Sequence, residues 1–217
     1  MTAPVQATMA ACEVAPRSHA IPSVLEHKRG RAGEPHVAPL DAVAIEIERV
    51  VGRPVPRFDP ASGGAGASVL LLLETPSRAG TFGSGLISID NDDTAAANLW
   101  RAHRATGLPR EVALVWNAVP WYVGDEARIR PARAGEIARG TPYLRQVLDR
   151  LPHLAVLIAL GRAAQRAAIA FEPELSRRGV AVLDAPHPSQ RVYNAPRQRA
   201  RERVHGALAA AARAVAK

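Results

Sequence analysis

The most informative segment for the fold is Ser68-Val-Leu-Leu-Leu-Leu73, which is followed at once by the polar turn Glu74-Thr75-Pro76-Ser77. An apolar run of this length without alternation is typical of a strand that is buried on both faces of a sheet. Three similar runs follow along the chain, at Val112–Trp116, Leu154–Leu160 and Val180–Leu183. Helical signals lie between them. Strands that alternate with helices predict a mainly parallel four-stranded sheet with right-handed crossovers.

Capping and breaking residues delimit the helices that we expect around these strands. Apolar residues at helical spacing predict a helix over 40–50, which Pro54 stops. Asp92-Asp93 is expected to open a second helix, which Gly107 closes after Thr106. Further helices are expected from Thr141-Pro142 to about Leu151, from about Ala163, and from about Pro196 to the end of the chain.

The chain is expected to form one domain preceded by an arm. Residues 1–38 mix Ala, Pro, Arg and His without a period, which predicts a flexible N-terminal arm. Residues 39–217 are then expected to form a single α/β domain, with the four-stranded parallel sheet flanked by helices. A chain of 217 residues is long enough for one such domain with a buried core.

Composition narrows the class of protein. The formal net charge of +8 favours a polyanionic partner such as DNA, although an Arg-rich composition alone also produces it. The single cysteine, Cys12, allows neither an internal disulfide nor an all-cysteine metal or iron–sulfur site. No apolar run approaches the ~20 residues of a membrane helix, and no signal pattern opens the chain. We therefore expect a cytoplasmic monomer that does not bind membranes.

Polar residues follow the ends of three predicted strands. Glu74 comes directly after the first strand, Asn117 after the second and His187 shortly after the fourth. In an open parallel α/β sheet, ligands bind beyond the carboxyl ends of the strands. These three side chains are therefore expected to meet at one edge of the sheet. An acid, an amide and an imidazole that converge in this way indicate a functional site.

Residues 65–210 resemble the uracil-DNA glycosylase superfamily, whose motifs occur here in the same order. The similar segments are Leu72–Pro76, Gly85-Leu86, Leu114–Val119, Val156–Gln165 and Val182–Ser189. The last segment, with His187-Pro188-Ser189, is the closest match, to the family's final catalytic loop. The resemblance implies a uracil-DNA glycosylase-like fold and a DNA glycosylase that needs no metal or cofactor.

The resemblance also implies roles for the residues at the strand ends. Asn117 corresponds to the amide that reads the edge of uracil, and His187 to the donor that stabilises the departing base. Glu74 stands where one branch has a Glu that orients the attacking water. Thr75 stands where the main family has its water-activating Asp. Another branch uses an acid further along the chain. The alternatives are therefore Asp90, Asn91 and Asp92, although helix capping is the competing interpretation for Asp92.

Further residues are expected around the flipped base and the DNA. Ser77 occupies the position of a Tyr that excludes thymine, and Ser88 that of a Phe that stacks on the base. Phe82 or Trp121, rather than the more core-like Trp116, is therefore expected to stack instead. The segment after the catalytic loop enters the minor groove in this family. The expected DNA contacts are Arg78, Ser189, Gln190, Arg191 and Tyr193, with Arg197, Arg199 and Arg201 as further phosphate contacts.

The expected function is hydrolysis of the N-glycosidic bond of uracil in single- or double-stranded DNA, which initiates base excision repair. Other deaminated bases are further candidate substrates. Two alternatives remain open from the sequence. One is a non-catalytic binder of uracil or abasic DNA on the same fold, because the main family's Asp and stacking Phe are absent. The other is an enzyme that acts on a free nucleoside or on another lesion.

Overall fold

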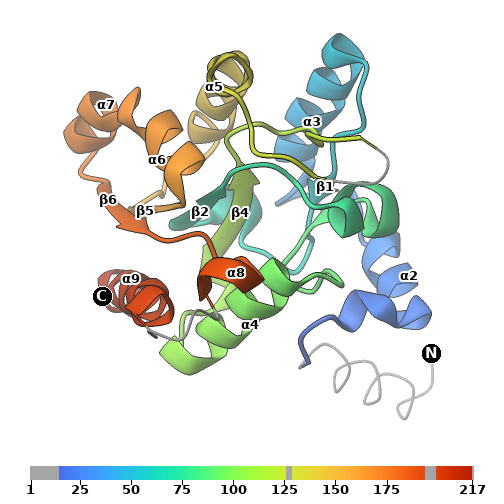
Figure 1. The fold of residues 1–217 in the computed structure, drawn as a ribbon, viewed down its shortest axis with the longest axis horizontal. Coiled ribbons are helices and arrows are strands. Elements are labelled where there is room, and N and C mark those ends of the chain that lie inside the picture. Colours follow the sequence, from blue (N-terminus) through green and yellow to red (C-terminus); the bar gives the residue numbers. More distant parts are fainter. Residues whose placement is uncertain (1–14, 126–128, 194–198, 217) are drawn as a thin grey trace.

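The computed structural model describes residues 15–125, 129–193 and 199–216, and its centre is a four-stranded parallel sheet (Figure 1). The strands lie in the order β4-β2-β5-β6. Their bounds are β2 (Val69–Leu73), β4 (Ala113–Asn117), β5 (Val156–Leu160) and β6 (Ala181–Ala185). All three neighbouring pairs are parallel. The α/β fold predicted from the apolar runs is confirmed.

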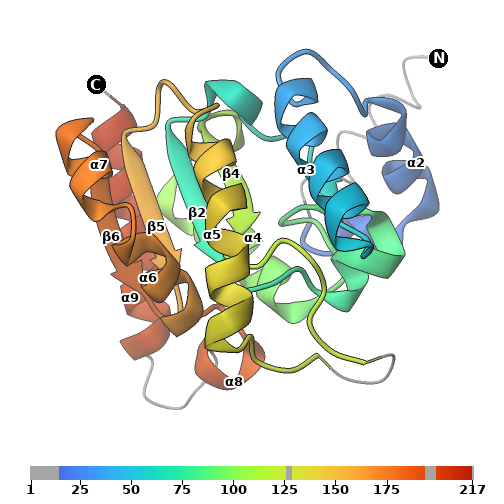
Figure 2. The same cartoon turned by 90° about the horizontal axis from the view of Figure 1, so that it is seen from above.

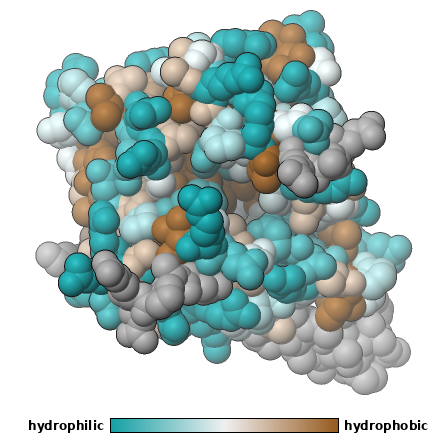
Figure 3. All heavy atoms as spheres, viewed as in Figure 1, coloured by the Kyte–Doolittle hydropathy of each residue, from teal (hydrophilic) through white to brown (hydrophobic). Residues whose placement is uncertain are grey.

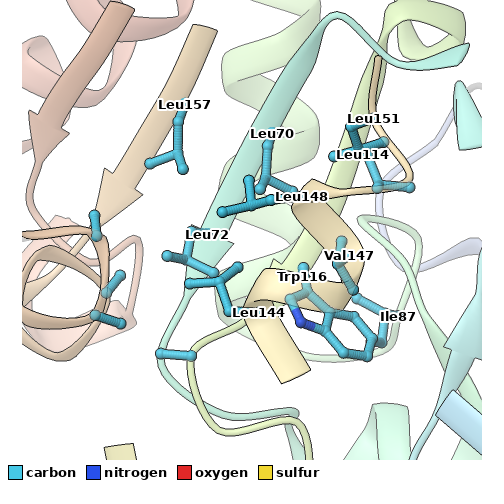
Figure 4. Packing of buried hydrophobic residues seen from close by; sticks show 14 of the residues in the cluster. Leu70, Leu72, Ile87, Leu114, Trp116, Leu144, Val147, Leu148, Leu151 and Leu157 are labelled. Atoms are coloured by element: carbon cyan, nitrogen blue, oxygen red, sulfur yellow. The ribbon is translucent and has the colours of Figure 1, made fainter. Parts of the chain in front are cut away.

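Helices cover both faces of the sheet (Figure 2). One face packs against α3 (Ala38–Val51), α5 (Ala134–Leu148) and α6 (Arg162–Ile169), and the other against α4 (Thr94–Thr106) and α9 (Arg199–Val215). Leu70 and Leu72 of β2 point towards the α5 side, where Figure 4 shows them beside Leu144 and Leu148. Leu71 points to the other face. Successive strand residues alternate between faces, so a strand covered on both sides is apolar throughout.

Shorter elements connect these layers. They are 3-10 helices at Ser18–Ala20, Gly64–Gly66 and Arg110–Val112, a π-helical turn at Ala79–Ser84, the helices α2 (Pro22–Gly30), α7 (Glu172–Arg177) and α8 (Gln190–Tyr193), and the strands β1 (Arg57–Phe58) and β3 (Leu86–Ile87). The β1 and β3 strands form a separate parallel pair. The Phe58 ring stacks on Trp116 with 4.6 Å between centroids, which fastens this pair to β4. Within the described ranges, no helix combines the length and the apolar character that a membrane span requires.

Two helix boundaries test the capping arguments. The prediction for α4 is confirmed, because Asp93 caps it by accepting a hydrogen bond from the Ala96 amide at 2.9 Å, and Gly107 ends it at a φ of 69°. The prediction that a helix begins at Thr141-Pro142 is wrong. The helix begins at Ala134, where the Glu136 carboxylate accepts a hydrogen bond from the Arg133 amide at 2.8 Å. Pro142 lies inside this helix. The free energy gained by packing this helix against the sheet is larger than the cost of the one backbone hydrogen bond that Pro142 cannot donate.

The prediction of a flexible arm over 1–38 is wrong for the described part of that segment. Residues 22–30 form α2, and the Lys28 side chain is fully buried. Its ammonium donates hydrogen bonds to the carboxylates of Asp59 and Asp90, which belong to distant parts of the chain. Residues 1–14 lie outside the described residues. A partner this far away in sequence leaves no local pattern, so composition alone suggested disorder.

Candidate active site

A cleft of about 1150 Å³ opens beyond the carboxyl ends of the parallel strands. Its lining includes Glu74 after β2, Asn117 at the end of β4, Gly161 after β5 and His187 after β6. Figure 3 shows the face that carries α8, which is hollowed near its centre. The structure therefore brings together the acid, the amide and the imidazole that follow three different strands.

Asn117 lines this cleft and carries a buried donor that no other described group uses. It is the last residue of β4, pairs in register with Leu73 of β2, and is only 3% exposed. Its side-chain nitrogen has no hydrogen-bond partner among the described residues. The backbone beyond it is held closely, because a Cβ atom at Gly140 of α5 would lie 2.0 Å from the Ala118 carbonyl oxygen. A buried amide without a partner is costly. A ligand that offers an acceptor fits this position.

His187 is held as a neutral ring with a defined donor. The Ser189 backbone N–H donates to its Nδ1 atom at 3.1 Å, so in the neutral ring the proton lies on Nε2. Burial lowers the pKa of His187 below its usual value, while the negative charges of Glu74 and Asp93 act in the opposite direction. The result is an Nε2–H group that can donate a hydrogen bond to a ligand in the cleft near neutral pH.

Neighbouring residues fix the loop that carries His187. A Cβ atom at Gly161, which has a φ of +93°, would lie 2.9 Å from the Cβ of His187. The Gly161 amide also donates to the carbonyl of Ala185 at 2.8 Å. On the other side, the Asn98 side chain of α4 donates to the Pro188 carbonyl at 2.8 Å. The loop is therefore clamped between the end of β5 and α4.

Two acids line the cleft beside His187, and Asp90 is not one of them. Glu74 accepts a hydrogen bond from the Ala132 amide. Asp93 accepts one from the Ser77 hydroxyl at 2.7 Å in addition to its capping bond. Asp90 is fully buried outside the cleft lining and is paired with Lys28 and Arg110. The prediction that Asp90 activates water is therefore wrong, because its carboxylate is bound to the cations of Lys28 and Arg110 and does not reach the cleft.

The other two alternatives to Asp90 also have structural partners. Asn91 lines the cleft, but its amide donates to the Leu86 carbonyl at 2.9 Å and its oxygen accepts from Ser84 at 2.7 Å. Asp92 forms an exposed ion pair with Arg17 at 3.0 Å. Sequence reasoning assigned Asp93 to capping alone and missed that it also lines the cleft. One carboxylate oxygen makes the cap while the other faces Ser77.

Among the residues that the structure describes, the expected aromatic does not line the cleft. Trp116 is buried against Phe58, as its core-like position suggested, and Trp121 is buried edge-on to Tyr143. Phe82 is 55% exposed, but it does not line the cleft; it lies against Tyr122 and under Arg78. Neither Phe82 nor Trp121 therefore stacks in this structure. In the described part of the chain the apolar lining is aliphatic, with Leu86, Ile87, Ile89, Ile129 and Pro131.

The remaining residues predicted to contact the base or the DNA lie in three different environments. Thr75, Ser77 and Ser88 line the cleft as expected, although the Ser88 hydroxyl also donates to the buried Asp59. Ser189 and Arg191 line it too, Gln190 is exposed at the start of α8, and Arg78 is exposed beside Phe82. Tyr193 does not fit a role in DNA contact, since it is 4% exposed and its hydroxyl bonds to His205 of α9 at 2.7 Å.

Three arginines at the cleft were not predicted from the sequence. Arg130, Arg162 and Arg203 join Arg191 in the lining, and they come from four different segments of the chain. Arg197 lies outside the described residues. Arg199 and Arg201 are exposed on α9. Alternating arginines in the 199–203 stretch signalled a basic helix but not which of them faces the cleft.

His19, Asp59 and Asp90 bring three metal-ligating atoms within 4.8 Å of one another. Lys28 already binds both of these carboxylates, and Arg110 pairs with both as well. Two positive charges thus balance two negative charges inside the cluster, and an added dication would be opposed by the two cations. This donor set fits an ammonium group better than a metal ion.

Comparison with known families agrees with the fold. The family model of the Uracil DNA glycosylase superfamily matches residues 63–209, more than half of the chain. The matched region contains all four strands of the sheet and every residue of the cleft named at the strand ends. The chain therefore belongs to the uracil DNA glycosylase superfamily. A search of curated protein sequences finds no match.

Proposed function

We propose that this protein is a DNA glycosylase that hydrolyses the N-glycosidic bond of uracil in DNA. Its family is one of glycosylases associated with DNA repair, which makes DNA the expected class of substrate. The observation that carries the proposal is the pairing of two groups in one cleft, the unpartnered amide of Asn117 and the neutral His187.

Base recognition is assigned to Asn117. Uracil presents an N–H donor and a carbonyl acceptor side by side, and an Asn amide offers the matching acceptor and donor. The side-chain nitrogen of Asn117 is buried without a partner, so a uracil carbonyl would satisfy it. A base with the opposite pattern would leave buried polar groups unpaired, which is a strong basis for discrimination.

His187 is assigned to the departing base. When the bond between C1′ and the base nitrogen breaks, its electron pair goes to the base, and negative charge develops on the carbonyl oxygen beside that nitrogen. A fixed N–H donor stabilises charge that appears only as the bond breaks. The Nε2–H of His187 is such a donor, because Ser189 occupies Nδ1. A water molecule then adds to C1′ and releases one proton to an acid of the cleft.

Glu74 is the better candidate for orienting that water. Both carboxylate oxygens of Asp93 are engaged, one by the Ala96 amide and the other by Ser77. Glu74 uses one oxygen for the Ala132 amide, and its second oxygen accepts no hydrogen bond from the described residues. A carboxylate held by one oxygen and open at the other can bind a water and take its proton. We expect Glu74→Gln to slow base release more than Asp93→Asn.

DNA contact is assigned to the arginines around the cleft. Arg191 of α8, Arg203 of α9, Arg162 of α6 and Arg130 of the segment before α5 all line the cleft. Guanidinium groups bind phosphates without reading sequence. Since no aromatic ring lines the described cleft, the flipped base is expected to rest on aliphatic side chains such as Ile87 and Pro131.

The test is base release from oligonucleotides that carry one uracil, one hypoxanthine, one xanthine or one thymine in a mismatch. The expected result is an abasic product from uracil in wild-type protein, with the other bases showing how far the pocket with Ser77 is relaxed. Tight binding to uracil DNA without any abasic product would instead favour a non-catalytic binder. The second candidate is worth testing because the cleft lining shows no aromatic ring in the described ranges of the chain.

A further inference from the structure

The segment before α3 supports one wall of the cleft from behind. We call residues 83–94 the cleft wall, because Leu86, Ile87, Ser88, Ile89, Asn91 and Asp93 within it line the cleft. The N-terminal segment, residues 17–29, contacts this wall at several points along its length. The His19 amide donates to the Asp90 carbonyl at 3.1 Å, and Arg29 donates to the carbonyls of Gly83 and Ser84 at 2.7 and 3.0 Å.

Lys28 is the buried centre of these contacts. Its side chain is fully buried, and its ammonium binds Asp59 at 2.9 Å and also Asp90. Arg110 pairs with the same two carboxylates at 3.1 and 2.8 Å. Burial alone would raise the pKa of Asp59, but Lys28 and Arg110 hold it below its ordinary value. Removing Lys28 would leave an uncompensated negative charge in the core, which a folded protein tolerates poorly.

The cluster is connected directly to residues of the cleft. The Ser88 hydroxyl donates to Asp59 and also accepts the Asp90 amide at 3.0 Å. Three residues after Asp90, Asp93 caps α4 and holds Ser77. A shift of Asp90 would therefore move the backbone on which Ser88 and Asp93 are carried, and both side chains line the cleft.

We propose that Lys28 is a positioning residue for base excision, which fixes the cleft wall through Asp59 and Asp90. This inference rests on the function proposed above. Lys28 and Asp59 both precede the region that matches the family model, which begins at residue 63. The N-terminal segment thus lies outside the region that matches the family model, and it holds the cleft wall within that region in place.

The experiment compares wild type with the double variant Lys28→Met/Asp59→Asn. The double variant removes one buried charge of each sign, so that Asp90 and Arg110 remain a balanced pair and the fold is retained better than with Lys28→Met alone. The control is Leu175→Ala, which creates a cavity in the core at α7, away from the cleft. All proteins are assayed at a temperature at which circular dichroism shows them to be folded.

Two readouts are taken. The first is backbone hydrogen exchange of residues 83–94, which we expect to accelerate in the double variant and not in Leu175→Ala. The second is the single-turnover rate of uracil release, which we expect to fall about 10- to 100-fold in the double variant, since misplacement of about 1 Å costs about that much. Leu175→Ala should retain the wild-type rate, because a purely structural loss does not change the rate of folded molecules.

The outcomes separate this inference from the proposed function. A double variant that releases uracil at the wild-type rate, or whose residues 83–94 exchange as slowly as in wild type, overturns the positioning role of Lys28. If wild type releases no uracil, the proposed function fails, and the hydrogen exchange alone decides whether Lys28 holds the cleft wall.

Discussion

Gly161→Ala is the substitution that tests the geometry of the site most specifically. Gly161 follows β5 at a φ of +93°, and a Cβ atom there would lie 2.9 Å from the Cβ of His187. Carbon atoms that are not bonded prefer about 3.5 to 4.0 Å. The new methyl group therefore lacks about 0.6 to 1.1 Å of room. We expect the His187 ring to be displaced by a distance of that order.

Two effects of this substitution can be separated by magnitude. Gly161 has a φ of 93° and a ψ of 166°, a region that is essentially restricted to glycine, where a side chain costs about 1–3 kcal/mol of stability. For a chain of this size, the melting temperature should fall by about 2 to 12 °C. A displacement of about 1 Å at a catalytic group costs about 100-fold in rate. We therefore expect a modest loss of stability and a large loss of activity.

Gly179→Ala provides the matched control. Gly179 has a φ of +72°, but a Cβ atom there would meet nothing within 4 Å. Both variants place a side chain at a positive φ, and only Gly161→Ala meets His187. Gly161 also has a ψ of 166°, so Gly161→Ala is expected to lose more stability than the control, and the rates of the folded proteins are compared. The assay is single-turnover release of uracil from a labelled oligonucleotide, with thermal unfolding measured in parallel. If both variants release uracil equally fast, the assignment of His187 is refuted.

Further predictions concern recognition, stability and DNA binding. Asn117→Ala should lower kcat/KM for uracil about 100-fold, as measured by steady-state kinetics, because it removes one fixed polar contact to the base. Burial lowers the pKa of His103 to about 4. Below about pH 6.5, His103 therefore binds a proton in the unfolded chain but not in the folded chain. The free energy of unfolding is highest above about pH 6.5 and falls by about 3 kcal/mol as the pH is lowered to about 4. Urea unfolding of wild type and His103→Gln across this range checks it. Arg191→Ala and Arg203→Ala should each weaken DNA binding and reduce the slope of log Kd against log salt by about 1. Arg104 lies outside the cleft lining, so Arg104→Ala should change neither the affinity nor the slope. Fluorescence anisotropy at several salt concentrations measures the affinity and the slope.

The strands and the strand-end site were accessible from sequence for a physical reason. A strand covered on both faces must be apolar throughout, so the apolar run at residues 69–73 predicts a buried strand without any information from the rest of the chain. Parallel strands end at one edge of the sheet, so the sequence alone predicts that Asn117 and His187 lie together, and both line the cleft. Both inferences use local pattern plus one general rule of topology.

Other parts depended on contacts between distant residues. Asp90 and Asp93 stand three positions apart in one polar run, and only Lys28 and Arg110, far away in sequence, bury the first and leave the second at the cleft. Tyr193 is likewise buried against α9, where its hydroxyl bonds to His205. Sequence spacing contains no signal for such pairings, because they are set by how the helices pack.

The central claim is that His187 stabilises the base as it leaves. The most direct measurement is the single-turnover rate of uracil release by His187→Ala, beside wild type and His153→Ala, whose histidine is exposed outside the cleft lining. We predict a loss of about 100-fold or more for His187→Ala and none for His153→Ala. Equal amounts of abasic product from wild type and His187→Ala would show that His187 does not stabilise the departing base.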